Sequence, residues 1–151
     1  MLSRFTAGDE PKSILADLGF TTLRLAAGLM MAFGHGLGKV PPAAGFVDAV
    51  GSLGFPMPPV FAWAAGLSEL VGGLLIAAGL FTRPASLFLA VTMGVAAFMK
   101  HGADPLFSRE GPSKELALFY FAAAIAFMLA GSGRFGLDFL LRGSRQDEAP
   151  E

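Results

Sequence analysis

The sequence predicts an all-α integral membrane protein, a four-helix bundle with a short interfacial helix between helices one and two. Hydrophobic residues make up 54% of its 151 residues and charged residues only 15%, against about 25% charged in a typical soluble domain. The mean hydropathy is +0.60. A soluble chain this short needs more polar side chains to cover its surface. The apolar residues gather into four runs, which cannot all be central helices of a soluble bundle.

The first two apolar runs have the length of membrane spans. The first covers residues 18–37 and is interrupted by Arg24 near its start and His35 near its end. The second covers residues 60–80 and carries Glu69 in its middle. Crossing a hydrocarbon core of about 30 Å takes roughly 20 helical residues, so each run predicts one transmembrane helix.

The third and fourth runs carry no charge and complete the bundle. The third, residues 84–99, is short, but Arg83 before it and Lys100 after it can extend to the membrane surfaces. So few residues separate it from the second run that the two predict a tight antiparallel hairpin. The fourth run covers residues 116–133.

The pattern of apolar residues between the first two spans predicts the short interfacial helix. It is bracketed by prolines, and Phe46, Val47, Val50 and Leu53 recur as on one helical face. A short amphipathic helix of this kind lies in the membrane interface. An irregular loop is the alternative, because of the prolines.

These runs define three regions and an orientation. We expect residues 1–17 to form a cytoplasmic N-terminal segment, residues 18–141 the transmembrane domain, and residues 142–151 a disordered tail. Six Lys and Arg residues lie outside the spans on the side of the termini and four on the other. Because cytoplasmic loops are enriched in Lys and Arg, this difference favours both termini in the cytoplasm.

Several function classes are excluded by what the sequence lacks. It has no cysteine, which excludes disulfides, thiol chemistry and cysteine-ligated metals. A net charge of −1 gives no indication of a nucleic-acid partner. No phosphate-binding loop, dinucleotide fingerprint or nucleophile elbow is present, so no catalytic residue is assigned.

Three ionisable residues lie inside the predicted spans: Arg24, His35 and Glu69. A charge there costs about 2.5–3.5 kcal/mol on insertion scales and is a functional candidate by default. Arg24 and His35 share one face of the first helix, and Lys39 continues that face. We expect Arg24 and Glu69 to form an ion pair inside the bundle, either holding two helices in register or serving a ligand.

Glycines surround His35 at the end of the first span. Gly34, Gly36 and Gly38 weaken the helix and expose backbone groups. This arrangement could admit a lipid headgroup or a quinone-like ring, with His35 donating a hydrogen bond or moving a proton. An interfacial histidine bonded to a neighbouring helix is the alternative.

The predicted ligand-binding residues are therefore Arg24, His35, Lys39 and Glu69. A second cluster on the same outer side would comprise Lys100, His101 and Glu115. His35 and His101 with a carboxylate resemble a metal ligand set. The sequence has no pair of ligands at helical spacing, such as His-x-x-x-His or Glu-x-x-His, so we expect no metal site.

Six different short motifs follow one another along residues 18–138. They are Leu23-Arg24-Leu25, Gly34 to Lys39, Gly54-Phe55-Pro56, Glu69 to Gly73, Gly79 to Arg83, and Gly131 to Asp138. In these motifs the chain resembles the DoxX family of small four-helix membrane proteins. The resemblance implies a bacterial inner-membrane location. It also implies association with a redox protein partner, since some relatives are subunits of a thiosulfate:quinone oxidoreductase.

Three functions follow from these features. The first is a subunit of a membrane redox system that binds a quinone non-covalently between helices one and two. The second is a non-catalytic scaffold or chaperone for another membrane protein, which exposed faces of small residues would support. The third is a small-molecule transporter, for which four spans are few and no paired repeat is found.

Overall fold

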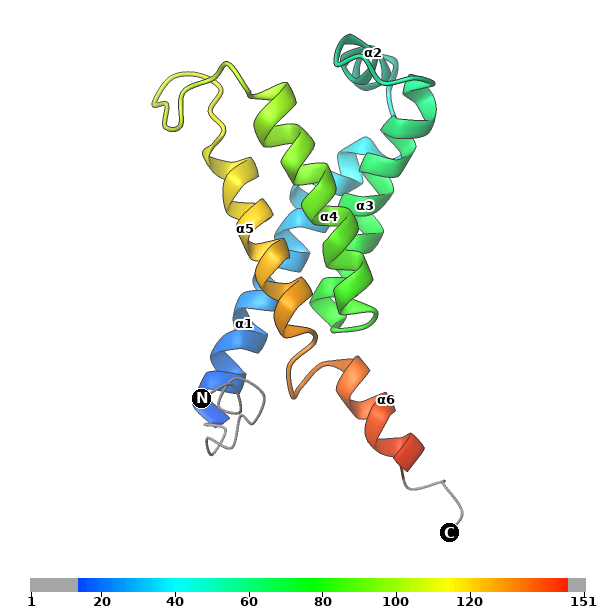
Figure 1. Cartoon of the computed structure of the whole chain (residues 1–151), viewed down its shortest axis with the longest axis vertical. Coiled ribbons are helices and arrows are strands. Elements are labelled where there is room, and N and C mark those ends of the chain that lie inside the picture. The colour runs from blue at the N-terminus through cyan, green and yellow to red at the C-terminus, as the bar shows by residue number, and fades with distance from the viewer. Residues whose placement is uncertain (1–13, 147–151) are drawn as a thin grey trace, which may run out of the picture.

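The computed structural model describes residues 14–146, and every regular element in that range is helical (Figure 1). In chain order they are α1 (Ile14–Met31), η2 (Ala32–Gly36), η3 (Leu37–Lys39), α2 (Ala44–Ser52), α3 (Pro58–Ala78), α4 (Thr82–Val95), η4 (Ala96–Lys100), α5 (Glu115–Ala130) and α6 (Leu137–Gln146). Here η2 and η4 are π-helical turns and η3 is a 3₁₀ turn. The turns η2 and η3 continue α1 without a break, and η4 continues α4. All the described elements are helices, and the predicted all-α membrane bundle is confirmed.

Three of these helices are long and apolar enough to cross a membrane: Ile14–Lys39, Pro58–Ala78 and Thr82–Lys100. The fourth, α5, has 16 residues and extends about 24 Å at 1.5 Å per residue. It is shorter than the predicted run because it ends before Gly131, whose φ of 81° departs from helical geometry. Local thinning of the bilayer accommodates such a span.

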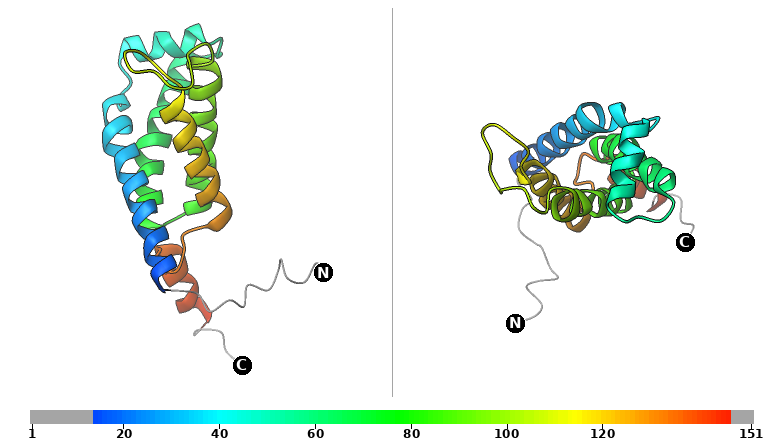
Figure 2. Two further views of the ribbon diagram at one scale, coloured as in Figure 1. Left: turned by 90° about the vertical axis from the view of Figure 1, so that its left-hand side faces the viewer. Right: turned by 90° about the horizontal axis from the view of Figure 1, so that it is seen from above.

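The helices pack in the order α1, α3, α4, α5 (Figure 2). Each successive pair is in extensive contact, whereas α5 touches α1 at only a few positions. The helix α2 lies across one end of the bundle, and α6 projects from the other (Figure 1). We call these the α2 end and the α6 end.

The surface of the bundle is apolar, as lipid contact requires. Large side chains on outward faces are exposed, among them Leu25, Leu74, Phe88 and Phe119. In water such a surface would mark an interaction site or an aggregation hazard. The interior is filled by a smaller set that includes Met31, Ile76, Leu89, Tyr120 and Phe127.

Glycines bring α1 and α3 into backbone contact. A Cβ on Gly28 would lie 2.6 Å from the backbone nitrogen of Ala77, and one on Gly73 would lie 2.8 Å from the carbonyl oxygen of Gly28. Small residues permit this approach between membrane helices.

The helix boundaries differ from the predicted ones at both ends of the chain. The helix α1 includes residues 14–17 of the predicted N-terminal segment. Order continues past residue 141 because α6 reaches Gln146. Its apolar residues alternate with polar ones at helical spacing, as in an amphipathic helix. The rest of both predicted segments, residues 1–13 and 147–151, lies outside the described residues.

Candidate functional site

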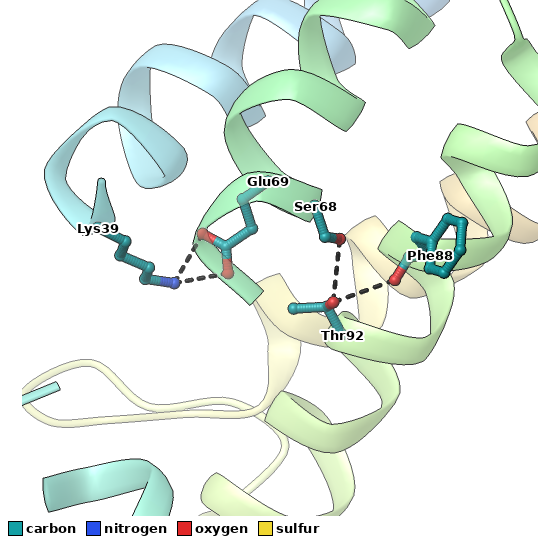
Figure 3. Close-up of polar contacts among 5 residues, drawn as sticks. All are labelled: Lys39, Ser68, Glu69, Phe88 and Thr92. Carbon is teal, nitrogen blue, oxygen red and sulfur yellow. Dashed lines mark hydrogen bonds and ion pairs between the residues drawn. The ribbon is translucent and has the colours of Figure 1, made fainter. Parts of the chain in front are cut away.

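A partly buried ion pair joins the end of the first span to the middle of α3. The Nζ atom of Lys39 donates to both carboxylate oxygens of Glu69, at 2.6 and 2.7 Å (Figure 3). The Glu69 side chain is 2% exposed and that of Lys39 is 32% exposed. The two charges meet because Gly36 packs directly on the backbone at Glu69 and Leu70.

The predicted ion pair between Arg24 and Glu69 is wrong. Nη1 of Arg24 donates instead to the carbonyl oxygens of Ile76 and Ala77, in the last turn of α3. Ile76 lies seven residues beyond Glu69, which is about 10 Å along a helix. The antiparallel register explains the error. Gly36 packs against Glu69, so a residue that lies earlier in the first span packs against a later residue of α3. Arg24 therefore lies beside the C-terminal end of α3.

Arg24 and Asp138 cap the two helix ends at the α3–α4 turn. The Arg24 guanidinium satisfies C-terminal carbonyls of α3, where a helix carries partial negative charge. The Asp138 carboxylate accepts hydrogen bonds from the backbone nitrogens of Phe81 at 2.8 Å and Thr82 at 2.9 Å, at the start of α4. Arg24 and Asp138 also attract each other electrostatically. These contacts give Arg24 an architectural role at the α6 end, away from Lys39 and Glu69.

His35 faces a different helix from its neighbour Gly36. Its imidazole lies edge-on against the ring of Tyr120 in α5, with ring centroids 5.7 Å apart. Tyr120 is 3% exposed, and His35 belongs to the π-helical turn η2, a feature that is frequent at functional sites. Tyr120 was not among the predicted site residues. The available signal was that it is the single tyrosine of the chain.

The predicted helix between the first two spans is confirmed as α2, and it reaches the ion pair. Val50 is buried and Phe46 is half-buried against the bundle. The Nζ atom of Lys39 lies 5.4 Å from the centroid of the Phe46 ring, a cation–π distance. The exposed side of the ion pair is therefore next to an aromatic ring of α2.

The second predicted cluster is arranged differently from the prediction. His101 pairs with Asp104, its Nδ1 atom lying 2.7 Å from the carboxylate, while Lys100 and Glu115 are exposed. Within residues 14–146, no three His, Asp or Glu side chains are placed to hold a metal ion. Of the predicted residues, Lys39 and Glu69 are thus in contact, His35 lies one helical turn from Lys39, and the others lie elsewhere.

A family model and several known proteins match parts of the chain. The sequence model of the DoxX family matches residues 19–102. The chain is 40% identical over 90 residues to an uncharacterised protein of Haemophilus influenzae, covering 58% of this chain and 64% of that protein. It is 37% identical over 98 residues to the inner membrane protein YphA of Escherichia coli, covering 62% and 70%.

A third relative carries a functional name. It is the Bacillus subtilis protein named "Putative oxidoreductase CatD", 34% identical over 77 residues, covering 51% of this chain and 55% of that protein. The matched regions are less than two thirds of the Haemophilus and Bacillus proteins. No solved structure is significantly similar to the chain. The family match covers more than half of the sequence, and the chain belongs to the DoxX family.

Proposed function

We propose that this protein is a subunit of a bacterial membrane redox system and binds a quinone non-covalently at the α2 end of its bundle. The observation that carries the proposal is the Glu69 carboxylate, 2% exposed on a membrane-spanning helix and held by Lys39. The name of the Bacillus relative supports the same class of function.

A partly buried charge pair adds little net stability to the contact between two helices. Desolvating the Glu69 carboxylate offsets much of its attraction to Lys39, and apolar replacements of such pairs are often neutral or stabilising. The helices α1 and α3 already approach closely through their glycines. Ionisable groups retained inside a membrane span typically serve substrates, ions or protons.

The geometry leaves hydrogen-bonding capacity for a ligand. An ammonium group has three N–H donors. Lys39 donates two hydrogen bonds to the two carboxylate oxygens of Glu69. Its third N–H can donate a hydrogen bond to a carbonyl oxygen of the quinone ring. His35, one turn earlier on the same segment, can donate or accept through its imidazole.

These groups fit the chemistry of a quinone. Reducing a quinone to its quinol takes two electrons and two protons, one proton for each ring oxygen. In this proposal His35 and Lys39 hold the ring oxygens and pass on protons, and a redox protein partner supplies the electrons. The protein itself contributes binding and orientation.

The test replaces both charges at once, with Lys39→Met and Glu69→Met in one protein. Because neither charge is left unpaired, we expect the variant to fold with near wild-type stability. It should lose saturable binding of decylubiquinone in detergent, measured by isothermal titration. Wild-type binding in the folded double variant would overturn the proposal and leave the pair with an architectural role.

A neighbouring polar contact supplies the matched control. The Thr92 hydroxyl donates to the Ser68 hydroxyl at 3.0 Å, joining α3 to α4 beside Glu69 (Figure 3). The variant Ser68→Ala with Thr92→Val removes that contact and leaves the ion pair in place. We expect it to bind decylubiquinone as the wild type does.

A further inference from the structure

We infer that the quinone ring binds beneath α2, in the place that the Phe46 side chain now fills, and that α2 lifts to admit it. This inference rests on the proposed function and names the position of the ring beside Lys39. The helix α2, which lies across this end of the bundle (Figure 1), is the cover of the site.

A ligand can reach the ion pair from the side of Lys39. The Glu69 side chain is 2% exposed, whereas that of Lys39 is 32% exposed. Two N–H groups of Lys39 are already donated to Glu69, so a ligand has to approach the ammonium from its exposed side. The half-buried ring of Phe46 lies against the ammonium there.

The Phe46 ring lies where the ring of a bound quinone would lie. The Nζ atom of Lys39 is 5.4 Å from the centroid of the Phe46 ring. When a quinone oxygen accepts a hydrogen bond from an ammonium group, the ring centroid lies about 5.5 Å from the nitrogen. Both rings are flat and six-membered, so one can take the place of the other on the exposed side of Lys39.

The exchange of the two rings improves the contact made by Lys39. The Phe46 ring offers the ammonium a cation–π contact, which is weak at a partly exposed position. A quinone offers an oxygen, which accepts a charge-assisted hydrogen bond. The apolar surroundings of Phe46 then receive the quinone ring, while the Phe46 side chain moves out with α2.

The helix α2 is lightly anchored, so it can lift without disturbing the spanning helices. Of its nine residues, Val50 is the buried one, whereas α3 and α4 each bury several side chains. Irregular segments flank α2 on both sides, at residues 40–43 and 53–57. Hinges of moving elements are typically formed by such loop residues.

Removing the Phe46 ring should open the site. In Phe46→Ala the quinone no longer has to displace a side chain, so we expect binding of decylubiquinone, measured by isothermal titration, to tighten about two- to fivefold. Phe55→Ala is the matched control. Phe55 is also half-buried beside α2, but its ring packs on Phe61, with centroids 4.8 Å apart. The control should bind as the wild type does.

A reversible tether tests whether α2 lifts. The chain has no cysteine, so a single disulfide can be introduced. A Cβ on Gly51, in the last turn of α2, would lie 3.6 Å from the Cβ of Pro58, at the start of α3, which falls within the roughly 3.5–4.5 Å found in disulfides. This bond pins one end of α2, and residues 40–43 tie the other end to Lys39.

The comparison is made within the one variant, Gly51→Cys with Pro58→Cys. We expect its oxidised form to bind decylubiquinone about tenfold or more weakly than its reduced form. The reduced form is blocked with iodoacetamide and freed of reductant before titration, so that no thiol reacts with the quinone.

The outcomes separate this inference from the function on which it rests. Tighter binding in Phe46→Ala and weaker binding in the oxidised tether, with Phe55→Ala unchanged, support the position beneath α2. Weaker binding in Phe46→Ala, or binding that oxidation of the tether leaves unchanged, would overturn that position while quinone binding stands. Absence of saturable binding in the wild type would overturn both.

Discussion

Removing Lys39 should destabilise the protein far more than removing Glu69, because the two partners are unequally buried. In Lys39→Met the Glu69 carboxylate, 2% exposed, loses the donor to both of its oxygens, and an unpaired buried charge costs about 3–5 kcal/mol. In Glu69→Gln the Lys39 ammonium, 32% exposed, can turn towards the interface on its flexible stem. That change should cost about 1 kcal/mol, close to the loss of a surface ion pair.

The assay is reversible unfolding in mixed micelles of lipid and SDS, followed by helical circular dichroism, for both single variants and the double Met variant. The double variant should lie near the wild type and be several kcal/mol more stable than Lys39→Met alone. Lys100→Met, at an exposed position, controls for the loss of a lysine and should have little effect. Equal costs for the two single variants, or a larger cost for Glu69→Gln, would refute the reasoning from burial.

Four further variants test other positions. Asp138→Ala removes the cap at the start of α4 and should lower the free energy of unfolding by about 0.5–2 kcal/mol; an unchanged value would argue against the cap. Gly73→Ala places a Cβ 2.8 Å from a carbonyl oxygen of α1 and should cost about 1–3 kcal/mol. Gly19→Ala, where a Cβ meets open space, should instead stabilise α1 by about 0.5–1 kcal/mol. His35→Ala should leave the melting temperature nearly unchanged and weaken decylubiquinone binding in titration, whereas loss of folding would make the histidine structural.

The fold could be predicted because it depends on features that are local in sequence. Apolar runs of span length identify membrane helices whatever their partners. Prolines at both ends marked the segment that contains α2, and the face carrying Phe46 and Val50 does pack on the bundle. The extension of α6 to Gln146 was missed, because a short amphipathic helix in a polar sequence resembles an unstructured tail.

The partners of the charged residues could not be predicted, because they depend on the register between two helices. A shift of two helical turns exchanges Arg24 and Lys39 as the nearest cation to Glu69. That register is set by the contact of Gly28 with Gly73, and apolar run boundaries do not specify it. Tyr120 was missed because its significance depends on α1 and α5 being neighbours, although they are far apart in sequence.

The most direct measurement is native mass spectrometry of the full chain, gently extracted from its own membrane, followed by organic extraction of what it carries. A quinone bound in stoichiometric amount in the wild type, and lost in the double Met variant, is the predicted result. Phospholipid alone, or a co-purifying protein with no quinone, would contradict the proposed function and favour a scaffold for a partner membrane protein.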